Sequence, residues 1–150
     1  KKDKIPDEEA PVEKLVGAIV YAKNKDSFYF AFVHDIFKHW TLSKGHLKEG
    51  EDENAGVKRV IKDEIGIDVA VKEILGENAY ITYNKEKKKI KKHVVYFLVE
   101  SKFEDLKLKE SGGLDDAKWF PIAEIDELNF YDDVLPIITK AVNILLNQKK

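Results

Sequence analysis

The sequence predicts an α/β protein in which a mixed sheet carries helices on both faces. Short runs rich in β-branched and aromatic residues, separated by turn signals, are typical of strands. Two longer stretches repeat their apolar residues every three or four positions, which indicates helices with one buried side. The order along the chain is strands, a helix, more strands and a last helix, which indicates one layered domain.

Two strands are expected near the start of the chain. Residues 1–13 are charged, include two prolines and lack an apolar period, so a tail or an edge segment is predicted there. The runs 15–21 and 28–34 are typical of strands, and a turn at 24–26 separates them. We assign Phe28, Phe30 and Phe32 to packing on one sheet face. The single domain is predicted to cover residues 14–150.

A loop with glycines and a helix follow. Gly45 and Gly50 stand near acidic residues, and glycine tolerates the backbone angles of a sharp turn. From about Glu53 the apolar residues recur at helical spacing, with Asp52 or Glu53 at the positive end of the helix. Gly66 fits the residue just past the helix, where a left-handed backbone costs glycine least. The side predicted to be buried carries Val57, Val60, Ile61 and Ile65.

The second half of the chain is expected to complete the sheet and add its other helix. Residues 68–83 form a long, interrupted strand region, and 93–99 is the clearest strand, which should be central. We interpret the lysine-rich turn between them as a solvated hairpin tip in preference to a phosphate-binding lip. Residues 122–128 indicate a short helix. Residues 132–146 indicate the closing amphipathic helix, whose first turn tolerates Pro136.

Composition excludes several classes of function. The 150 residues, 43% of them hydrophobic, can bury a substantial core. The formal net charge of −2 gives no overall field for nucleic acid or acidic membrane, and no apolar run reaches the roughly 18 residues of a membrane span. Cysteine is absent, which excludes disulfides, thiolate catalysis and cysteine-zinc sites. We therefore expect a cytoplasmic protein, and we take it to be a monomer or homodimer.

The loop and helix at 45–67 resemble the Nudix box. That motif is a Gly, five residues, a Glu, seven residues, then Arg-Glu-apolar-any-Glu-Glu-any-Gly-apolar. Asp63 is a conservative replacement of one Glu, and Val60 replaces another, which binds a divalent metal in the family. The resemblance implies the Nudix fold, an α/β/α sandwich. The positions in register are Gly45, Glu51, Arg59, Ile61, Glu64, Gly66 and Ile67.

The resemblance also implies roles within the box. Residues 60, 63 and 64 share one helix face, where side chains can converge on one ion. Asp63 and Glu64 are the expected metal ligands and catalytic carboxylates, with Mg²⁺ or Mn²⁺ as the cofactor, since hard cations bind oxygen. Arg59 is expected to pair with Glu51 and hold the loop to the helix. The structural residues of the box are then Gly45, Glu51, Arg59 and Gly66.

The residues just before the box resemble one particular group within the family. Trp40, followed by Lys44-Gly45-His46, is similar to the lead-in of the diadenosine tetraphosphate hydrolases and their relatives that act on diphosphoinositol polyphosphates. Ser43 stands where those enzymes usually have Pro. The resemblance implies that Lys44 and His46 face polyphosphate oxygens, one as a point charge and the other through a hydrogen bond.

Two further features of that group map onto the chain less directly. In the group an aromatic residue stacks on adenine, for which Tyr83 is the first candidate here and Tyr80 the alternate. The group also has a Glu that binds metal or activates water a few positions before a Trp-containing strand. Gly113 occupies its place in this chain, and Asp115 or Asp116 could substitute only if the loop shifts.

Two functions remain open. The first is a Nudix-type hydrolase of phosphoric anhydride bonds: a Mg²⁺-dependent pyrophosphohydrolase of a nucleoside diphosphate derivative, in particular a dinucleoside polyphosphate such as diadenosine tetraphosphate. The second is a catalytically weak or inactive Nudix domain that binds a nucleotide or a protein. Val60 favours the second, whereas Asp63, Glu64, Lys44 and His46 favour the first. An RNA 5′-end pyrophosphohydrolase is disfavoured by the lack of a strongly basic surface.

Overall fold

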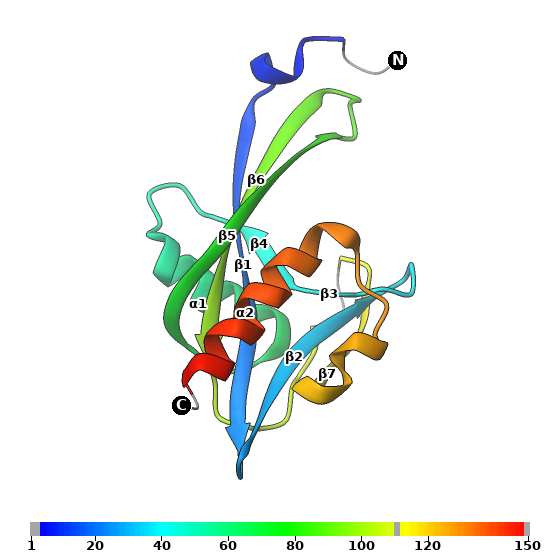
Figure 1. Ribbon diagram of the computed structural model, residues 1–150. Coiled ribbons are helices and arrows are strands. Elements are labelled where there is room, and N and C mark those ends of the chain that lie inside the picture. Colours follow the sequence, from blue (N-terminus) through cyan, green and yellow to red (C-terminus); the bar gives the residue numbers. More distant parts are fainter. Residues whose placement is uncertain (1–3, 110–111, 149–150) are drawn as a thin grey trace.

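The fold is a mixed β-sheet between two α-helices (Figure 1). The computed structural model describes residues 4–109 and 112–148. The helices are α1 (Glu53–Ile65) and α2 (Leu135–Gln148), with 3₁₀ turns η1 (Asp7–Glu9), η2 (Ile122–Glu127) and η3 (Asp132–Val134). The strands are β1 (Val12–Asn24), β2 (Ser27–Asp35), β3 (Trp40–Thr41), β4 (Ser43–His46), β5 (Ala70–Tyr83), β6 (Lys89–Glu100) and β7 (Leu114–Pro121). The predicted α/β class is confirmed.

Strand β1 organises the sheet. It pairs in parallel with β6, and antiparallel with β2 and β4. The main path of the sheet runs β3-β2-β1-β6-β5, while β7 pairs with β2. Because β4 pairs with the first half of β1 and leads into the loop before α1, the predicted site loop starts inside the sheet.

Each face of the sheet has its own hydrophobic core. Alternate residues of β1 enter different cores, as the two-residue period of a strand requires. The core that contains Ile19 includes residues of α2, and the core that contains Val20 includes residues of α1. Both faces of β1 are therefore covered, which explains why its residues 15–22 are all buried.

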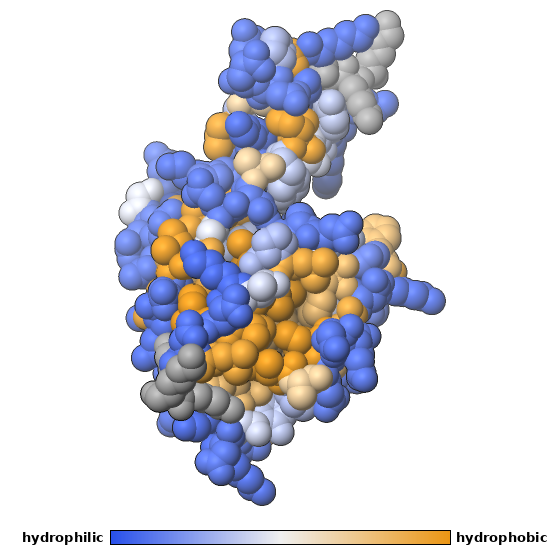
Figure 2. Space-filling view, viewed as in Figure 1, coloured by the Kyte–Doolittle hydropathy of each residue, from blue (hydrophilic) through white to orange (hydrophobic). Residues whose placement is uncertain are grey.

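An apolar groove remains between α2 and the segment before it. Figure 2 shows apolar side chains gathered on this face of the molecule. The groove is lined mainly by Ile125, Phe130, Leu135, Ile138 and Val142.

The start of β1 and the β5–β6 hairpin extend past the helices as an arm (Figure 1). Lys89 donates a hydrogen bond of 2.9 Å to Asp7 and ties η1 to the hairpin. Strand β1 begins at Val12, which pairs with Lys91, so the predicted boundary at residue 14 falls inside a strand. Main-chain pairing with β6 orders residues 12 and 13 although their side chains show no strand pattern.

The predicted elements are present with shifted ends. The strands expected at 15–21, 28–34 and 93–99 are longer, because main-chain pairing continues past the apolar runs. The closing helix starts as a 3₁₀ turn at Asp132, and Pro136 lies in the first turn of α2. The short helix expected at 122–128 is a 3₁₀ helix. Within residues 4–109 and 112–148, no helix has the length and apolar character needed to cross a membrane.

Candidate active site

Helix α1 begins and ends as its sequence predicts. The Asp52 side chain accepts a hydrogen bond of 3.2 Å from the backbone N–H of Ala55, which caps the first turn. Gly66 adopts a left-handed backbone with φ of 77°, and its N–H donates to the carbonyl of Lys62. These local signals determine where the helix begins and ends.

Arg59 holds the preceding loop against the helix. Its Nε donates to Glu51 Oε2 and its Nη2 to Glu51 Oε1, both at 2.8 Å. Nη2 also donates to the carbonyl of His46 at 2.9 Å, and the backbone N–H of Lys48 donates to Glu51. The hydrogen bonds from Arg59 are the main reason why the pKa of Glu51 falls to about 2. The pairing predicted from the sequence is therefore present.

Val60 lies in a different environment from the two acids that follow it. Only 5% of Val60 is exposed, and it belongs to the core between α1 and the sheet. It also forms part of the wall of a small surface depression that contains Asp63 and Glu64. The three positions thus adjoin one space, but Val60 contributes an apolar wall and no oxygen ligand.

Glu64 is the buried acid of the site. Within the part of the chain that the structure describes, its Oε1 is buried and has no hydrogen-bond partner. Burial raises the pKa of Glu64 to about 7, while a hydrogen bond from Ser43 and the charge of Lys44 oppose the shift. Asp63 is mostly solvent-exposed, with its Oδ2 at 3.9 Å from Arg59 Nη1. Glu64 is therefore the acid of the site that is shielded from solvent, whereas solvent reaches Asp63.

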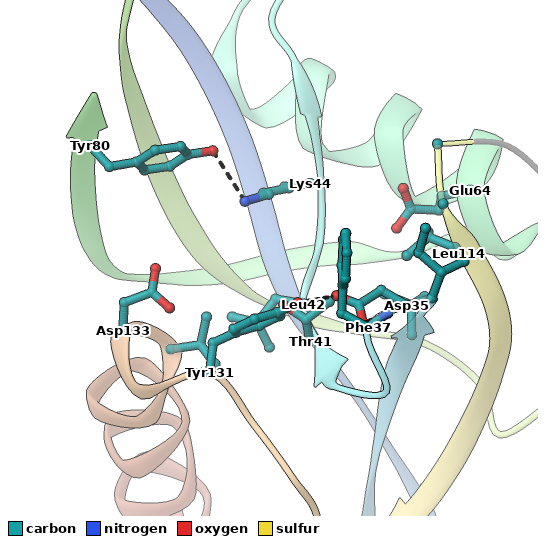
Figure 3. A pocket seen from close by; sticks show the side chains of 15 residues that line it. Asp35, Phe37, Thr41, Leu42, Lys44, Glu64, Tyr80, Leu114, Tyr131 and Asp133 are labelled. Atoms are coloured by element: carbon teal, nitrogen blue, oxygen red, sulfur yellow. Dashed lines mark hydrogen bonds between the residues drawn. The ribbon is translucent and has the colours of Figure 1, made fainter. Parts of the chain in front are cut away.

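A cavity of about 600 Å³ opens beside Glu64. Figure 3 shows Tyr80 and Lys44 reaching it from β5 and β4, and Tyr131 and Asp133 from the segment before α2. Lys44 Nζ donates to the Tyr80 hydroxyl at 3.3 Å. The residues that line the cavity are Val33, Asp35, Ile36, Phe37, Thr41, Leu42, Lys44, Glu64, Tyr80, Gly112, Gly113, Leu114, Tyr131, Asp133 and Val134.

The loop between β2 and β3 forms a wall of this cavity and is held by hydrogen bonds to Asp35. The Asp35 carboxylate accepts hydrogen bonds from the backbone N–H groups of Phe37 and His39 and from the Tyr131 hydroxyl. The His39 ring stacks on Tyr131 with a centroid distance of 3.9 Å. Phe37 is 70% exposed although it lines the cavity. Asp35 thus holds the backbone of the loop that carries the exposed Phe37 ring at the cavity.

Two residues expected to contact substrate lie elsewhere. Tyr83 is outside the cavity lining and Tyr80 is part of it, because residues three apart in a continuously paired strand point to opposite faces. His46 Nε2 lies 2.9 Å from Glu13 Oε1 and lines neither the cavity nor the depression. Of the predicted binding residues, Lys44 and the alternate aromatic residue Tyr80 line the cavity together with Glu64.

The two acids considered as substitutes at Gly113 lie at the start of strand β7. Gly113 lines the cavity, whereas Asp115 pairs with His34 at 2.7 Å and Asp116 lies 3.7 Å from Lys118. Neither acid lines the cavity or the depression. Among the described residues, neither Asp115 nor Asp116 therefore takes the place of the acid that is missing at Gly113.

Sequence reasoning missed four residues that shape the site. Asp35, Phe37 and Tyr131 come from the two loops around the cavity mouth, and their approach depends on tertiary structure. Ser43 was noted only as a departure from Pro, yet it is buried and donates to Glu64. The hydroxyl group of Ser43, two positions before Gly45, was the only feature of the sequence that could have suggested a hydrogen bond to Glu64.

Two carboxylates could hold a divalent metal. Among the described residues, no group of three or more His, Asp or Glu side chains is placed to hold an ion. The unpaired Glu64 oxygen and the exposed Asp63 nevertheless suit Mg²⁺, which is commonly bound by one or two carboxylates, waters and substrate phosphates. The donor set fits a metal whose coordination is completed by a bound polyphosphate.

Comparison with known proteins identifies the class. A model of the NUDIX domain matches residues 13–140, so the chain belongs to the NUDIX domain family. The bis(5′-nucleosyl)-tetraphosphatase (asymmetrical) of Sus scrofa is 27% identical over 111 residues, which cover 71% of this chain and 72% of that protein.

Solved structures support the same fold. A C. elegans Ap4A hydrolase in a binary complex has a TM-score of 0.69 at 24% identity, covering 90% of this chain and 98% of that chain. A NUDIX family hydrolase from Clostridium perfringens has a TM-score of 0.66 at 14% identity, covering 89% and 97%. The predicted Nudix fold is confirmed, as is the predicted class, a Nudix-type hydrolase of phosphoric anhydride bonds.

Proposed function

We propose that the protein is a Mg²⁺- or Mn²⁺-dependent pyrophosphohydrolase of a nucleoside diphosphate derivative, in particular a dinucleoside polyphosphate such as diadenosine tetraphosphate. The observation that carries the proposal is the buried, unpaired oxygen of Glu64 beside a 600 Å³ cavity. That cavity offers aromatic rings and the Lys44 ammonium, which suit a base and a phosphate chain. The name of the Sus scrofa relative points to the same substrate class.

The proposed roles follow from position. Tyr80 would stack on a base, and Lys44 would bind phosphate oxygens after giving up its hydrogen bond to Tyr80. A carboxylate of the site, with Glu64 as the first candidate, would orient or deprotonate the attacking water. Asp63 and Glu64 would hold the divalent ion, which supplies charge neutralisation and polarisation of the phosphoanhydride. Arg59 and Glu51 keep the loop in place.

One observation favours the alternative of a weakly active or inactive binding module. Val60 is buried and supplies no ligand, so among the described residues Asp63 and Glu64 would hold the metal without a third acid. Such a site has less negative charge with which to retain a cation when no polyphosphate is present. The alternative module would use the same cavity for a nucleotide and would show binding without turnover.

Product analysis tests the proposal. Pure protein is incubated with Mg²⁺ and a panel of dinucleoside polyphosphates, ADP-ribose, capped RNA and inositol pyrophosphates, and products are separated by chromatography. We expect cleavage of a dinucleoside polyphosphate and its loss in Glu64→Gln. Binding of a nucleotide without cleavage of any panel member would favour the binding module. As part of the proposal, the partner is a small nucleotide and the location is cytoplasmic, with the chain a monomer or homodimer.

A further inference from the structure

A segment distant from the box in sequence runs along the end of helix α1. The backbone N–H of Lys107 donates to the carbonyl of Ile65, and that of Lys109 to the carbonyl of Glu64, both at 2.9 Å. The last carbonyls of a helix have no partner within the helix, so these bonds satisfy them. Trp119 Nε1 donates to the carbonyl of Glu104 at 2.7 Å and holds the same segment from the other side. Lys109 is therefore fixed beside Glu64.

The Lys109 side chain forms part of the small depression on the far side of Glu64. This depression has a volume of about 170 Å³ and shares Lys44 and Glu64 with the larger cavity. Pockets for whole small molecules begin at roughly 300 Å³. The depression therefore has room for a phosphate group and not for a nucleoside. Its lining is Lys44, Gly45, Arg59, Val60, Asp63, Glu64 and Lys109.

The charges around the depression leave Lys109 available for an anion. Arg59 is engaged by Glu51 through two hydrogen bonds of 2.8 Å. Asp63 lies 3.9 Å from Arg59 and is 63% exposed. Within residues 4–109 and 112–148, no ion pair joins the Lys109 ammonium to a carboxylate. Lys44 and Lys109 thus line the same depression as the buried acid.

We propose that Lys109 binds a phosphate group of the nucleotide substrate in this depression, while the base occupies the larger cavity. The inference rests on the proposed function for the identity of the ligand. A lysine ammonium is a point charge that suits phosphate oxygens. Because Val60 adds no carboxylate, the depression would retain a divalent cation less strongly than a site with three acids. Lys109 supplies positive charge from the protein itself. Lys44, which lines both spaces, would then contact the phosphate chain between the base and the phosphate bound by Lys109.

Calorimetric titration of the full chain with tripolyphosphate, in EDTA and separately in Mg²⁺, tests Lys109 directly. We expect Lys109→Ala to raise the Kd for tripolyphosphate about tenfold in EDTA, and Lys109→Arg to restore most of the affinity. Lys107→Ala is the matched control, since it belongs to the same segment, lines neither space and keeps the Cβ that lies next to Gly66. Its Kd should equal that of the wild type.

Three outcomes would overturn the inference: equal affinity of Lys109→Ala and wild type, equal loss in Lys109→Ala and Lys107→Ala, or no measurable binding by the wild type. Turnover separates this test from that of the proposed function. If Lys109→Ala weakens tripolyphosphate binding but no nucleotide is cleaved by the wild type, the inference stands and the hydrolase proposal fails. If the wild type cleaves a nucleotide and Lys109→Ala leaves KM unchanged, the inference fails alone.

Discussion

The side chain of Val60 packs against the backbone of Gly45. A Cβ atom at position 45 would lie 2.9 Å from Val60 Cγ2, which is closer than real Cβ contacts allow. The first glycine of the box and the apolar residue in its helix therefore form one contact between β4 and α1. This contact holds Lys44 next to Glu64, since Lys44 precedes Gly45 in the same strand.

Gly45→Ala should destabilise the fold by about 1–3 kcal/mol, the usual cost of adding a methyl group to a packed interior. Val60→Ala removes the methyl groups that the new Cβ would meet, so the double variant should lose less stability than the sum of the two single variants. Urea unfolding of all four proteins measures this coupling. Strict additivity would show that the two residues do not constrain each other.

Val60→Glu is expected to lower stability in EDTA by roughly 3 kcal/mol, because it places an uncompensated charge where only 5% of the native residue is exposed. The new carboxylate would face the depression that contains Asp63 and Glu64, so Mg²⁺ should recover part of the lost Tm. Val60→Gln is the control of equal size without charge, and Mg²⁺ should not raise its Tm more than that of the wild type. Equal Mg²⁺ responses of the two variants would exclude a metal near position 60.

Acid should weaken the contact between Arg59 and Glu51 that holds the loop to α1, because it protonates Glu51. Its pKa is lowered to about 2 by the hydrogen bonds from Arg59, so its contribution to stability is complete above about 4.5 and is lost as pH falls toward 2. Arg59→Ala removes that contribution, and its Tm should fall less steeply than that of the wild type over this range. At pH 7 the free energy of unfolding of Arg59→Ala should fall by more than about 0.5 kcal/mol, the usual limit for a surface substitution. Parallel Tm-against-pH curves would contradict this account.

Glu64→Gln should weaken Mg²⁺ or Mn²⁺ binding, measured with a bound nucleotide, by about tenfold or about 1.4 kcal/mol. The reason is the loss of the buried oxygen that has no protein partner. Asp63→Asn should have a smaller effect, because Asp63 is 63% exposed and lies near the Arg59 guanidinium. Metal titration by calorimetry gives both affinities. Equal affinity of Glu64→Gln and wild type would remove Glu64 from the metal site.

Local signals explain what the sequence could predict about the fold and the site. The bounds of α1 depend on Asp52 and Gly66, which act within one turn of the helix. Arg59 and Glu51 are eight residues apart, and their contact was predicted from the resemblance to the box. Strand ends were less accurate, because pairing partners far along the chain decide where a strand stops.

The cavity could not be predicted because its walls come from separate parts of the chain. Asp35 and Tyr131 are 96 residues apart, and neither shows in the sequence that it needs the other. The choice between Tyr80 and Tyr83 required the register of β5 against β6, which determines the face to which each side chain points. Both candidates are tyrosines, so the pairing register of the strands, and not the residue type, decides which one lines the cavity.

The two tyrosines of β5 provide a matched test of base binding. Tyr80 lines the cavity, packs beside the core covered by α2 and accepts a hydrogen bond from Lys44. Tyr83 belongs to the same strand but lies outside the lining. Tyr80→Ala should raise the KM for a dinucleoside polyphosphate about tenfold, since stacking on a base contributes roughly 1–3 kcal/mol, whereas Tyr83→Ala should leave KM close to that of the wild type.

Tyr80→Phe separates the ring from the hydroxyl in this series. The variant keeps the stacking surface and frees Lys44 from its 3.3 Å hydrogen bond, so we expect KM to stay the same or fall. Steady-state kinetics on the three variants, with Tm as a check of folding, gives the comparison. A rise in KM for Tyr83→Ala with none for Tyr80→Ala would move the base to the opposite face of β5. A rise for Tyr80→Phe equal to that for Tyr80→Ala would assign the effect to the hydroxyl and would exclude stacking as its cause.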